Sequence, residues 1–374
     1  MIYLDNAATG GFLPRPVLEA VAEALTHPAN PGRSAHEASL SALARVTEAR
    51  SALADAMGFY DPARVIFTKN CTEALNLAVF GTLRRGGHVI STVLEHNSVL
   101  RPLFELRRRG WITLSLAEPD QTGRVGVRQI LPLLRPDTYL LAVTACSNVT
   151  GGGGELEELG GLCRARGLLF LVDGAQAAGH FPLRMQNWGI RLLALPGHKG
   201  LLGPQGTGAL LFDDSVPLRP VSFGGTGTDS ASVFQPSLPP EAFESGTLNL
   251  PGIAGWSAGL NFLKDNRAAL KKRMSDLTAA LDEGLRQIPG LTLFSVPNEC
   301  GIFSFLLEGQ TSSETADLLA REGICVRGGL HCAPKVHAFL RTSERGLVRA
   351  SLSPFNTLNE VETFLKTLAR IRTG

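Results

Sequence analysis

A carboxylate and a lysine, each placed just after an apolar run, are the residues of this sequence best suited to chemistry. Residues 168–172 form an unbroken apolar run that ends at Asp173, and a second run at 192–195 precedes His198 and Lys199. Short apolar runs of this kind predict strands that are buried on both faces. In open α/β sheets, ligands bind beyond the carboxyl ends of the strands. A buried carboxylate and an amine at that edge are what pyridoxal 5'-phosphate (PLP) requires of a protein, because one holds the protonated pyridine nitrogen and the other forms an imine.

Further polar residues follow other predicted strands. Thr72 begins the helix expected after a strand at 65–68, His96 follows a strand at 89–92, and Asn148 follows a strand at 139–144. A hydroxyl in the first turn of a helix, beside free backbone N–H groups, is well placed to bind phosphate. A sixth strand is expected at 208–212. Strands that alternate with helical stretches predict a largely parallel sheet with helices on both faces. One site that collects residues from several loops is therefore expected.

The predicted elements give an α/β fold with two domains. Residues 13–252 are expected to form a large domain with a mainly parallel sheet, and residues 1–12 and 253–374 a smaller α+β domain. Helices are predicted after Pro14, from about 39 to 57, and from about 253 to 288, the last with one break allowed for. The stretch between Pro217 and Pro251 is rich in Gly, Pro, Ser and Thr, which indicates a long functional loop.

Composition excludes several classes of protein. Lys and Arg total 36 against 34 for Asp and Glu, so nucleic acid is not expected as a partner. No segment approaches the length of a membrane span, and the N-terminus lacks the features of a signal peptide. The six cysteines form no CxxC pair and no metal-like spacing, which favours reduced thiols in a cytoplasmic protein without a metal site.

Ten motifs together give the chain a family resemblance. It resembles the class V aminotransferase-like PLP enzymes, specifically the cysteine desulfurases and selenocysteine lyases. The motifs occur in the family's order over almost the full length: YLDNAAT (3–9), NPGRSAH (30–36), FTKNCTEALN (67–76), EHN (95–97), SNVTG (147–151), DGAQAAGH (173–180), GHKGLLGPQGTG (197–208), FESGTLN (243–249), VRGGLHCAP (326–334) and VRASLSPFNTLNEV (348–361).

The resemblance implies fold type I of the PLP-dependent transferases and a cofactor site. Lys199 would form the imine with PLP, and Asp173 would pair with the pyridinium nitrogen. The remaining cofactor contacts implied by the family are Gln176 on the phenolic oxygen, His96 stacked on the ring and relaying protons, Thr72 and His198 on the phosphate, and Thr247 reaching the phosphate from the partner subunit of a homodimer.

The resemblance also implies the substrate side of the site. Arg349 would bind the substrate carboxylate as a bidentate clamp, and Asn148 would lie near that carboxylate. Cys332 would be the nucleophile on a mobile loop. In a desulfurase, the Cys332 thiolate attacks the sulfur of L-cysteine or a related amino acid, which leaves alanine and a persulfide. That persulfide is then passed to a protein or small-thiol acceptor.

Each of these residues also has a simpler structural role available. Asp173 and Thr72 could cap helices, His96 could be a core histidine, Arg349 could be a salt-bridge partner, and Cys332 could be inert. Cys332 lies in a glycine-rich stretch, 328–334, which favours a reactive thiol.

Three features depart from the family pattern. Pro196 replaces a frequent hydroxyl residue, Asn97 replaces a second histidine, and residues 151–154 are all glycine. The short spacing between Cys332 and Arg349 resembles the group II branch of the family. These departures indicate a divergent branch.

The favoured hypothesis is a cysteine desulfurase. The alternatives are a selenocysteine lyase, another C–S lyase, an aminotransferase, or a catalytically silent regulator with the same fold. Transamination needs no cysteine nucleophile, so the presence of Cys332 argues against an aminotransferase. A lone lysine is usually a solvated surface residue, but Lys199 follows an apolar run within Gly-His-Lys-Gly. A silent protein would not be expected to keep Lys199, Asp173, His96, Cys332 and Arg349 together.

Overall fold

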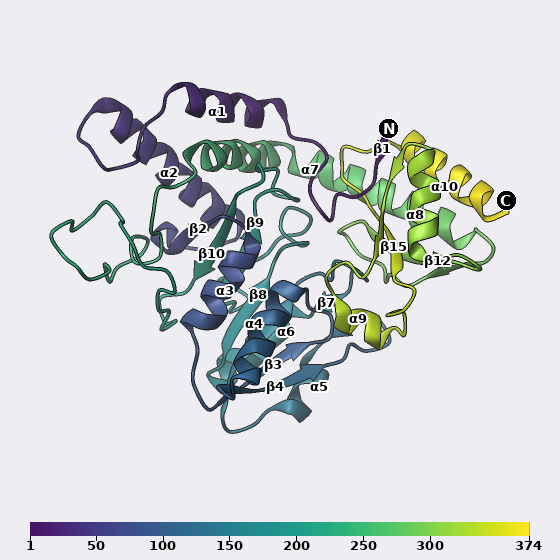
Figure 1. Ribbon diagram of the computed structural model, residues 1–374, viewed down its shortest axis with the longest axis horizontal. Coiled ribbons are helices and arrows are strands. Elements are labelled where there is room, and N and C mark those ends of the chain that lie inside the picture. The colour runs from purple at the N-terminus through teal and green to yellow at the C-terminus, as the bar shows by residue number, and fades with distance from the viewer. Residues whose placement is uncertain (374) are drawn as a thin grey trace.

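A seven-stranded sheet forms the centre of the larger part of the molecule (Figure 1). The structure is a computed structural model that describes residues 1–373. The strand order is β2–β10–β9–β8–β6–β3–β4, in which β10 is antiparallel to both neighbours and the other pairs are parallel. The strands are β2 (Val65–Thr68), β3 (Gly87–Thr92), β4 (Ile112–Ala117), β6 (Thr138–Thr144), β8 (Leu169–Asp173), β9 (Leu192–Pro196) and β10 (Gly208–Phe212).

Helices cover both faces of this sheet, as the apolar strands require. Along β8, Phe170 and Val172 pack into one buried cluster and Leu171 into another, because successive side chains of a strand point to opposite faces. The first cluster includes α2 (Glu37–Ala56), α6 (Leu156–Arg166) and the start of α7 (Leu250–Arg286). The second cluster includes α3 (Cys71–Gly81) and α4 (Asn97–Arg108). Helix α1 (Arg15–Thr26) lies along α7.

A second sheet lies in the C-terminal part of the chain. It is antiparallel, with the order β11 (Leu291–Leu293), β12 (Ile302–Leu307), β15 (Leu347–Ser351), β14 (Arg327–Gly329). Its core also takes in α7, α8 (Ser312–Arg321) and α10 (Leu358–Thr373). The N-terminal β1 (Ile2–Tyr3) pairs with β13 (Ile324–Cys325), so both ends of the chain lie in this part of the molecule (Figure 1).

The remaining elements are short. They are η1 (Pro62–Arg64), β5 (Arg124–Val125), α5 (Val127–Ile130), η2 (Leu131–Leu133), β7 (Gly153–Gly154) and α9 (Pro334–Phe339).

Helix α7 connects the two sheets. It runs unbroken over 37 residues, which corresponds to about 55 Å at 1.5 Å per residue. Asn249 caps its start by accepting a hydrogen bond from Gly252 N at 3.1 Å. The sequence left room for one break in this helix, but the described helix has none. Its small residues, including Gly255 and Gly259, pack closely against Val21 and the backbone of Leu202.

The six core strands expected from apolar runs are present, and β4 is an addition that the sequence did not predict. The division at residue 252 remains a prediction. It is supported by the pairing of β1 with β13. Among the described residues, no helix is both long and apolar enough to cross a membrane.

Candidate active site

The carboxyl ends of the central strands bring the predicted site residues together. In the parallel register, Thr144 at the end of β6 faces Asp173 at the end of β8, which in turn faces Ala194 of β9. The loops after these strands therefore start at one edge of the sheet. His96, Asn148 and Lys199 all follow strands that end there.

Asp173 is buried at this edge of the sheet. Its side chain is only 3% exposed, and Oδ1 accepts hydrogen bonds from Ala175 N at 2.9 Å and from Cys71 Sγ at 3.6 Å. Burial raises the pKa of Asp173, while the two donors and the charge of Lys199 oppose the shift. A buried carboxylate of this kind gains most from a cationic partner, which a protonated pyridine nitrogen provides.

Lys199 lies in the loop after β9. Burial lowers its pKa, and the charge of Arg349 lowers it further against the opposing effect of Asp173. A lowered pKa increases the fraction of neutral amine, which is the nucleophilic form. The loop is fixed by hydrogen bonds from Gly10 N to His198 O and from Gly203 N to Gly197 O, both at 2.8 Å.

His96 caps the first turn of α4. Its Nδ1 accepts from Ser98 N at 3.1 Å and lies 2.9 Å from Ser98 Oγ, which is 2.8 Å from Thr72 Oγ1. A hydroxyl chain therefore joins His96 to Thr72. Burial, followed by the charges of Lys199 and Arg349, lowers the pKa of His96 to about 4, so the ring is neutral at physiological pH.

Two other side chains attach the N-terminal segment to the site. His198 Nδ1 lies 3.0 Å from Thr9 Oγ1, and Gln176 Nε2 donates to Ala7 O at 2.9 Å. Burial lowers the pKa of His198 to about 4. With a Thr9 hydroxyl on Nδ1, the neutral His198 ring can present an Nε2–H group to an anion.

The start of α3 is suited to phosphate. Thr72 is the second residue of this 11-residue helix, and Asn70 caps the helix by accepting from Glu73 N at 2.9 Å. The first N–H groups of a helix have no partner within it and carry a partial positive charge. Together with Thr72 Oγ1 they can cradle phosphate oxygens.

Cys332 is exposed and is held against the start of α4. Its carbonyl oxygen accepts from Asn97 N at 2.7 Å, and the preceding carbonyl, of His331, accepts from Asn148 Nδ2 at 2.7 Å. His331 and Cys332 have φ values of +49° and +57°, a left-handed conformation that is strained for residues with a Cβ. The large sheet thus fixes the backbone of the loop while the thiol remains accessible.

The neighbouring His331 ring turns into the protein. It is 5% exposed, and Nε2 lies 3.0 Å from Leu347 O. Burial and the charge of Arg349 lower its pKa to about 2, so it supplies no positive charge beside Cys332.

Arg349 lies on β15 and is 2% exposed. Nη2 donates to Asp5 Oδ1 at 2.7 Å, Nη1 donates to Asn148 O at 3.1 Å, and Nε is buried with no partner among the described residues. Burial lowers the pKa of Arg349, and Asp5 opposes the shift. Asn148 therefore contacts both Arg349 and the Cys332 loop, and its own Oδ1 is buried without a partner in the described chain.

Several residues of the site were not predicted from the sequence. Asp5, Thr9, Cys71 and Glu95 all lie inside motifs quoted above, but no strand-end argument singled them out. Glu95 is fully buried directly before His96, and burial raises its pKa to about 8. Ser98, which joins His96 to Thr72, follows the EHN motif.

Thr247 is placed apart from these residues. It is exposed in the segment between β10 and α7, and no hydrogen bond within the described chain joins it to the site. Nearby Glu244 is anchored by a buried ion pair with Arg50, whose Nη1 lies 2.8 Å from Glu244 Oε1, and by Phe67 N. The role expected for Thr247 in a partner subunit remains a prediction.

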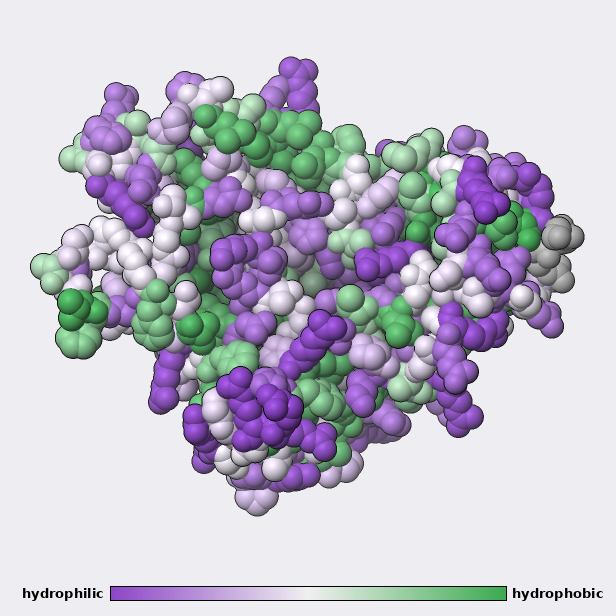
Figure 2. Space-filling model, in the orientation of Figure 1, coloured by the Kyte–Doolittle hydropathy of each residue, from purple (hydrophilic) through white to green (hydrophobic). Residues whose placement is uncertain are grey.

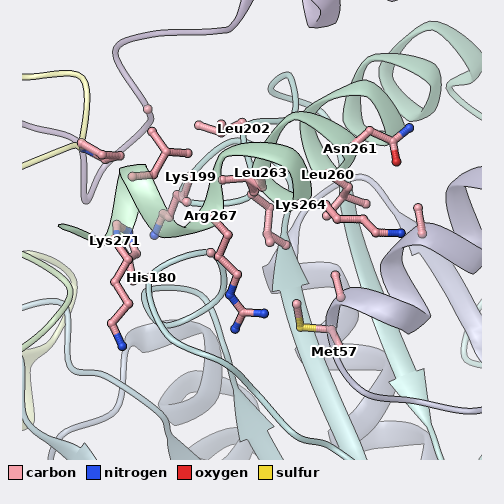
Figure 3. Close-up of a pocket in the computed structure, with 18 of the residues that line it drawn as sticks. Met57, His180, Lys199, Leu202, Leu260, Asn261, Leu263, Lys264, Arg267 and Lys271 are labelled. Atoms are coloured by element: carbon pink, nitrogen blue, oxygen red, sulfur yellow. The ribbon is translucent and has the colours of Figure 1, made fainter. Parts of the chain in front are cut away.

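A cavity of about 770 Å³ lies behind the Lys199 loop, between α2 and α7 (Figure 3). Lys264, Arg267 and Lys271 project from α7 on its wall, and His180 lies nearby. Lys199 belongs to the lining, but Asp173 and Cys332 do not. The cavity thus borders the strand-end site and shares Lys199 with it.

The strand-end residues fit PLP by their donor set. Asp173 offers a buried carboxylate for a ring nitrogen, Lys199 an amine with a lowered pKa, and α3 an anion seat at Thr72. Nε of buried Arg349 has no partner among residues 1–373, so it is a hydrogen-bond donor that a ligand can satisfy.

Comparison with known proteins agrees with this geometry. The chain matches the family "Aminotransferase class-V" over residues 2–364. A Pyrococcus abyssi protein named "Probable cysteine desulfurase" is 34% identical, covering 99% of this chain and 94% of the relative. A protein of the same name from Methanothermobacter thermautotrophicus is also 34% identical, with 99% and 94% covered.

Solved structures share the whole fold. The apo cysteine desulfurase from Thermococcus onnurineus NA1 superposes with a TM-score of 0.92 at 32% identity and covers 100% of this chain and 95% of its own. The cysteine desulfurase CsdA from Escherichia coli gives a TM-score of 0.89 at 29% identity, with 98% and 94% covered. The expected α/β fold of the PLP-dependent transferases is confirmed, and the chain belongs to the class-V aminotransferase family, whose members use PLP.

Proposed function

We propose that the protein is a PLP-dependent cysteine desulfurase that converts L-cysteine to L-alanine and carries the sulfur as a persulfide on Cys332. The observation that carries the proposal is the placement of Cys332: it is exposed, its backbone carbonyl accepts from Asn97 N directly after His96, and Asn148 ties its loop to Arg349. An aminotransferase has no use for such a thiol. The desulfurase names of the relatives support the same reaction.

The residues around the cofactor have distinct tasks. Bound PLP would draw electrons from the substrate α-carbon so that its proton can leave. Asp173 would hold the ring nitrogen protonated, neutral His96 would stack on the ring, and Gln176 would hydrogen-bond the phenolic oxygen. Thr72 and His198 would bind the phosphate, and Lys199 Nζ would take and return the α-proton.

The substrate side completes the reaction. Arg349 would orient the carboxylate of cysteine so that its sulfur faces Cys332 Sγ. The Cys332 thiolate would attack that sulfur, the carbon–sulfur bond of the substrate would break, and alanine would leave. The sum is cysteine plus the Cys332 thiol giving alanine plus a Cys332 persulfide, which an exposed position leaves open to a protein or small-thiol acceptor.

A homodimer is part of this proposal. The segment between β10 and α7 carries exposed apolar side chains, including Phe223 (70%), Val233 (91%) and Phe234 (82%). Figure 2 shows hydrophobic surface on this loop at the left edge of the molecule. Apolar residues gathered on one exposed segment mark an interaction surface, and a partner docked there could bring Thr247 to the phosphate of the other subunit.

The Cys332→Ser variant tests the function. It is expected to bind PLP and cysteine but to release no alanine and to show no added sulfur by intact mass, whereas the wild type gains a single sulfur at Cys332. Cys325→Ser, at a partly buried position on β13, is the matched control and should retain the reaction. Undiminished alanine formation by Cys332→Ser would refute the proposal. Parallel assays with selenocysteine decide between a desulfurase and a selenocysteine lyase.

A further inference from the structure

Glu95 is an acid buried without a cation. Its side chain is fully buried, and no lysine, arginine or histidine of residues 1–373 forms an ion pair with it. Oε1 accepts from Thr92 Oγ1 at 2.6 Å and from Thr144 N at 2.9 Å, whereas Oε2 is buried with no partner in the described chain. An ionised carboxylate in this place would leave much of its charge uncompensated, whereas the neutral acid leaves a single O–H group unsatisfied.

The position of Glu95 connects both sides of the cofactor site. Its hydrogen bonds join Thr92 at the end of β3 to Thr144 at the end of β6. Thr92 Oγ1 also accepts from Leu94 N at 3.0 Å, so the whole turn that leads into His96 is tied down. Thr144 in turn pairs in register with Asp173. A change at Glu95 therefore reaches the stacking histidine and the ring-nitrogen carboxylate.

The protonation state of Glu95 affects the charge around Asp173. Asp173, on β8, is the charged group that acts on Glu95, while β3 and β6 contribute the uncharged Thr92 and Thr144. Lys199 and Cys71 act on Asp173. Two carboxylates at one buried edge disfavour each other's ionisation. Burial raises the pKa of Glu95 to about 8, so it is mostly neutral at pH 7.

We propose that Glu95 is a positioning residue that works as a neutral acid: it ties the turn that presents His96 to the end of β6, and it keeps a second negative charge away from Asp173. Its ionisation at alkaline pH puts that charge beside Asp173 and weakens the turn, so the site loses activity. This inference rests on the proposed roles of Asp173 and His96 toward PLP. Glu95 itself touches neither substrate nor cofactor in this assignment.

The protonation state is tested on the apoprotein, where activity plays no part. Infrared difference spectra between pH 6 and pH 10 should show a protonated carboxyl band in the wild type that disappears with a midpoint near pH 8. The band should be missing from Glu95→Gln and retained in Glu118→Gln, in which an exposed glutamate is changed. A band that survives in Glu95→Gln, or its absence from the wild type at pH 7, would overturn the inference.

The positioning role is tested on the PLP-loaded protein. With a midpoint near pH 8, the protonated fraction of Glu95 falls roughly tenfold between pH 7 and pH 9. The ratio of alanine formation at pH 9 to that at pH 7 should therefore be roughly tenfold higher for Glu95→Gln than for the wild type, and the pH dependence of the bound-PLP absorbance should change in parallel. Equal ratios and equal spectral titrations would reject the role. If the wild type forms no alanine at any pH, the proposed function fails, and the spectral comparison still decides the role of Glu95.

Discussion

Replacing Arg349 with lysine should separate substrate binding from cofactor binding. The guanidinium donates to Asp5 and to Asn148 O and keeps Nε unpartnered in the described chain, so its planar fork serves three directions at once. A lysine keeps the positive charge but offers one nitrogen. It cannot hold Asp5, the Asn148 carbonyl and a substrate carboxylate in the same geometry.

The size of the effect follows from the contacts that are lost. A hydrogen bond to a charged group contributes about 1.5–3 kcal/mol, so the loss of one arm of the carboxylate clamp should lower kcat/KM for cysteine roughly 10- to 150-fold, at 1.4 kcal/mol per factor of ten. Most of this loss should appear in KM, because the carboxylate is bound equally in the ground and transition states. PLP content should be unchanged, since Arg349 forms no contact with Asp173 or Thr72 among the described hydrogen bonds.

The assay is steady-state alanine formation. Absorbance at roughly 420 nm, where a PLP imine absorbs, monitors the cofactor. The control is Asp5→Asn, which removes the counter-ion and leaves the guanidinium in place. Asp5→Asn should lower stability without raising KM, because it removes a negative charge that repels the substrate carboxylate. A KM rise of equal size in both variants would show that Arg349 acts only through Asp5. An unchanged kcat/KM in Arg349→Lys would reject the clamp outright.

Three further predictions concern stability. Gly152→Ala should lower the free energy of unfolding by about 1–3 kcal/mol in urea titrations, because its Cβ would lie 2.2 Å from a backbone carbonyl oxygen, whereas Gly161→Ala, with open space around it, should not. Arg50→Ala should leave Glu244 buried and unpaired and cost about 3–5 kcal/mol; limited proteolysis should then cut the 217–249 segment sooner, and an unaltered cleavage rate would contradict the anchor. Burial lowers the pKa of His180 to about 4, so the unfolded chain binds a proton at His180 before the folded chain does, and the free energy of unfolding should fall as pH drops from about 6.5 toward 4. His180→Asn should reduce the slope of the free energy of unfolding against pH by up to one proton. An unchanged slope would assign the acid sensitivity to other groups.

Much of the fold was readable from local pattern. Six of the seven strands of the large sheet contain short apolar runs, because strands covered on both faces bury side chains on both of those faces. Strand β4 was missed because it lies at the sheet edge and only Ile112 and Ala117 are buried there. The continuity of α7 was also missed. Its glycines weaken a helix in isolation, and only close packing against α1 and the Lys199 loop stabilises them.

The candidate site, too, was predictable from the sequence only in part. Asp173, Lys199, His96 and Asn148 follow predicted strands, so their meeting at one edge follows from a parallel sheet. Arg349 lies on β15 of the second sheet and Cys332 in the loop after β14, and their place at this edge followed only from the family resemblance. Contacts such as Asn97 N to Cys332 O and Arg349 to Asp5 join residues more than 200 positions apart, which local pattern cannot anticipate.

The sequence by itself therefore determined the chemistry available: a carboxylate, an amine, an imidazole, a thiol and a guanidinium, in motifs that point to PLP. Their protonation states were decided by the tertiary structure, because burial and neighbouring charges set a pKa. It neutralises His96, lowers the pKa of Lys199 and raises that of Asp173. It also turns the His331 ring into the protein and gives Glu95, a residue of the EHN motif to which the sequence assigned no role, a proton at neutral pH.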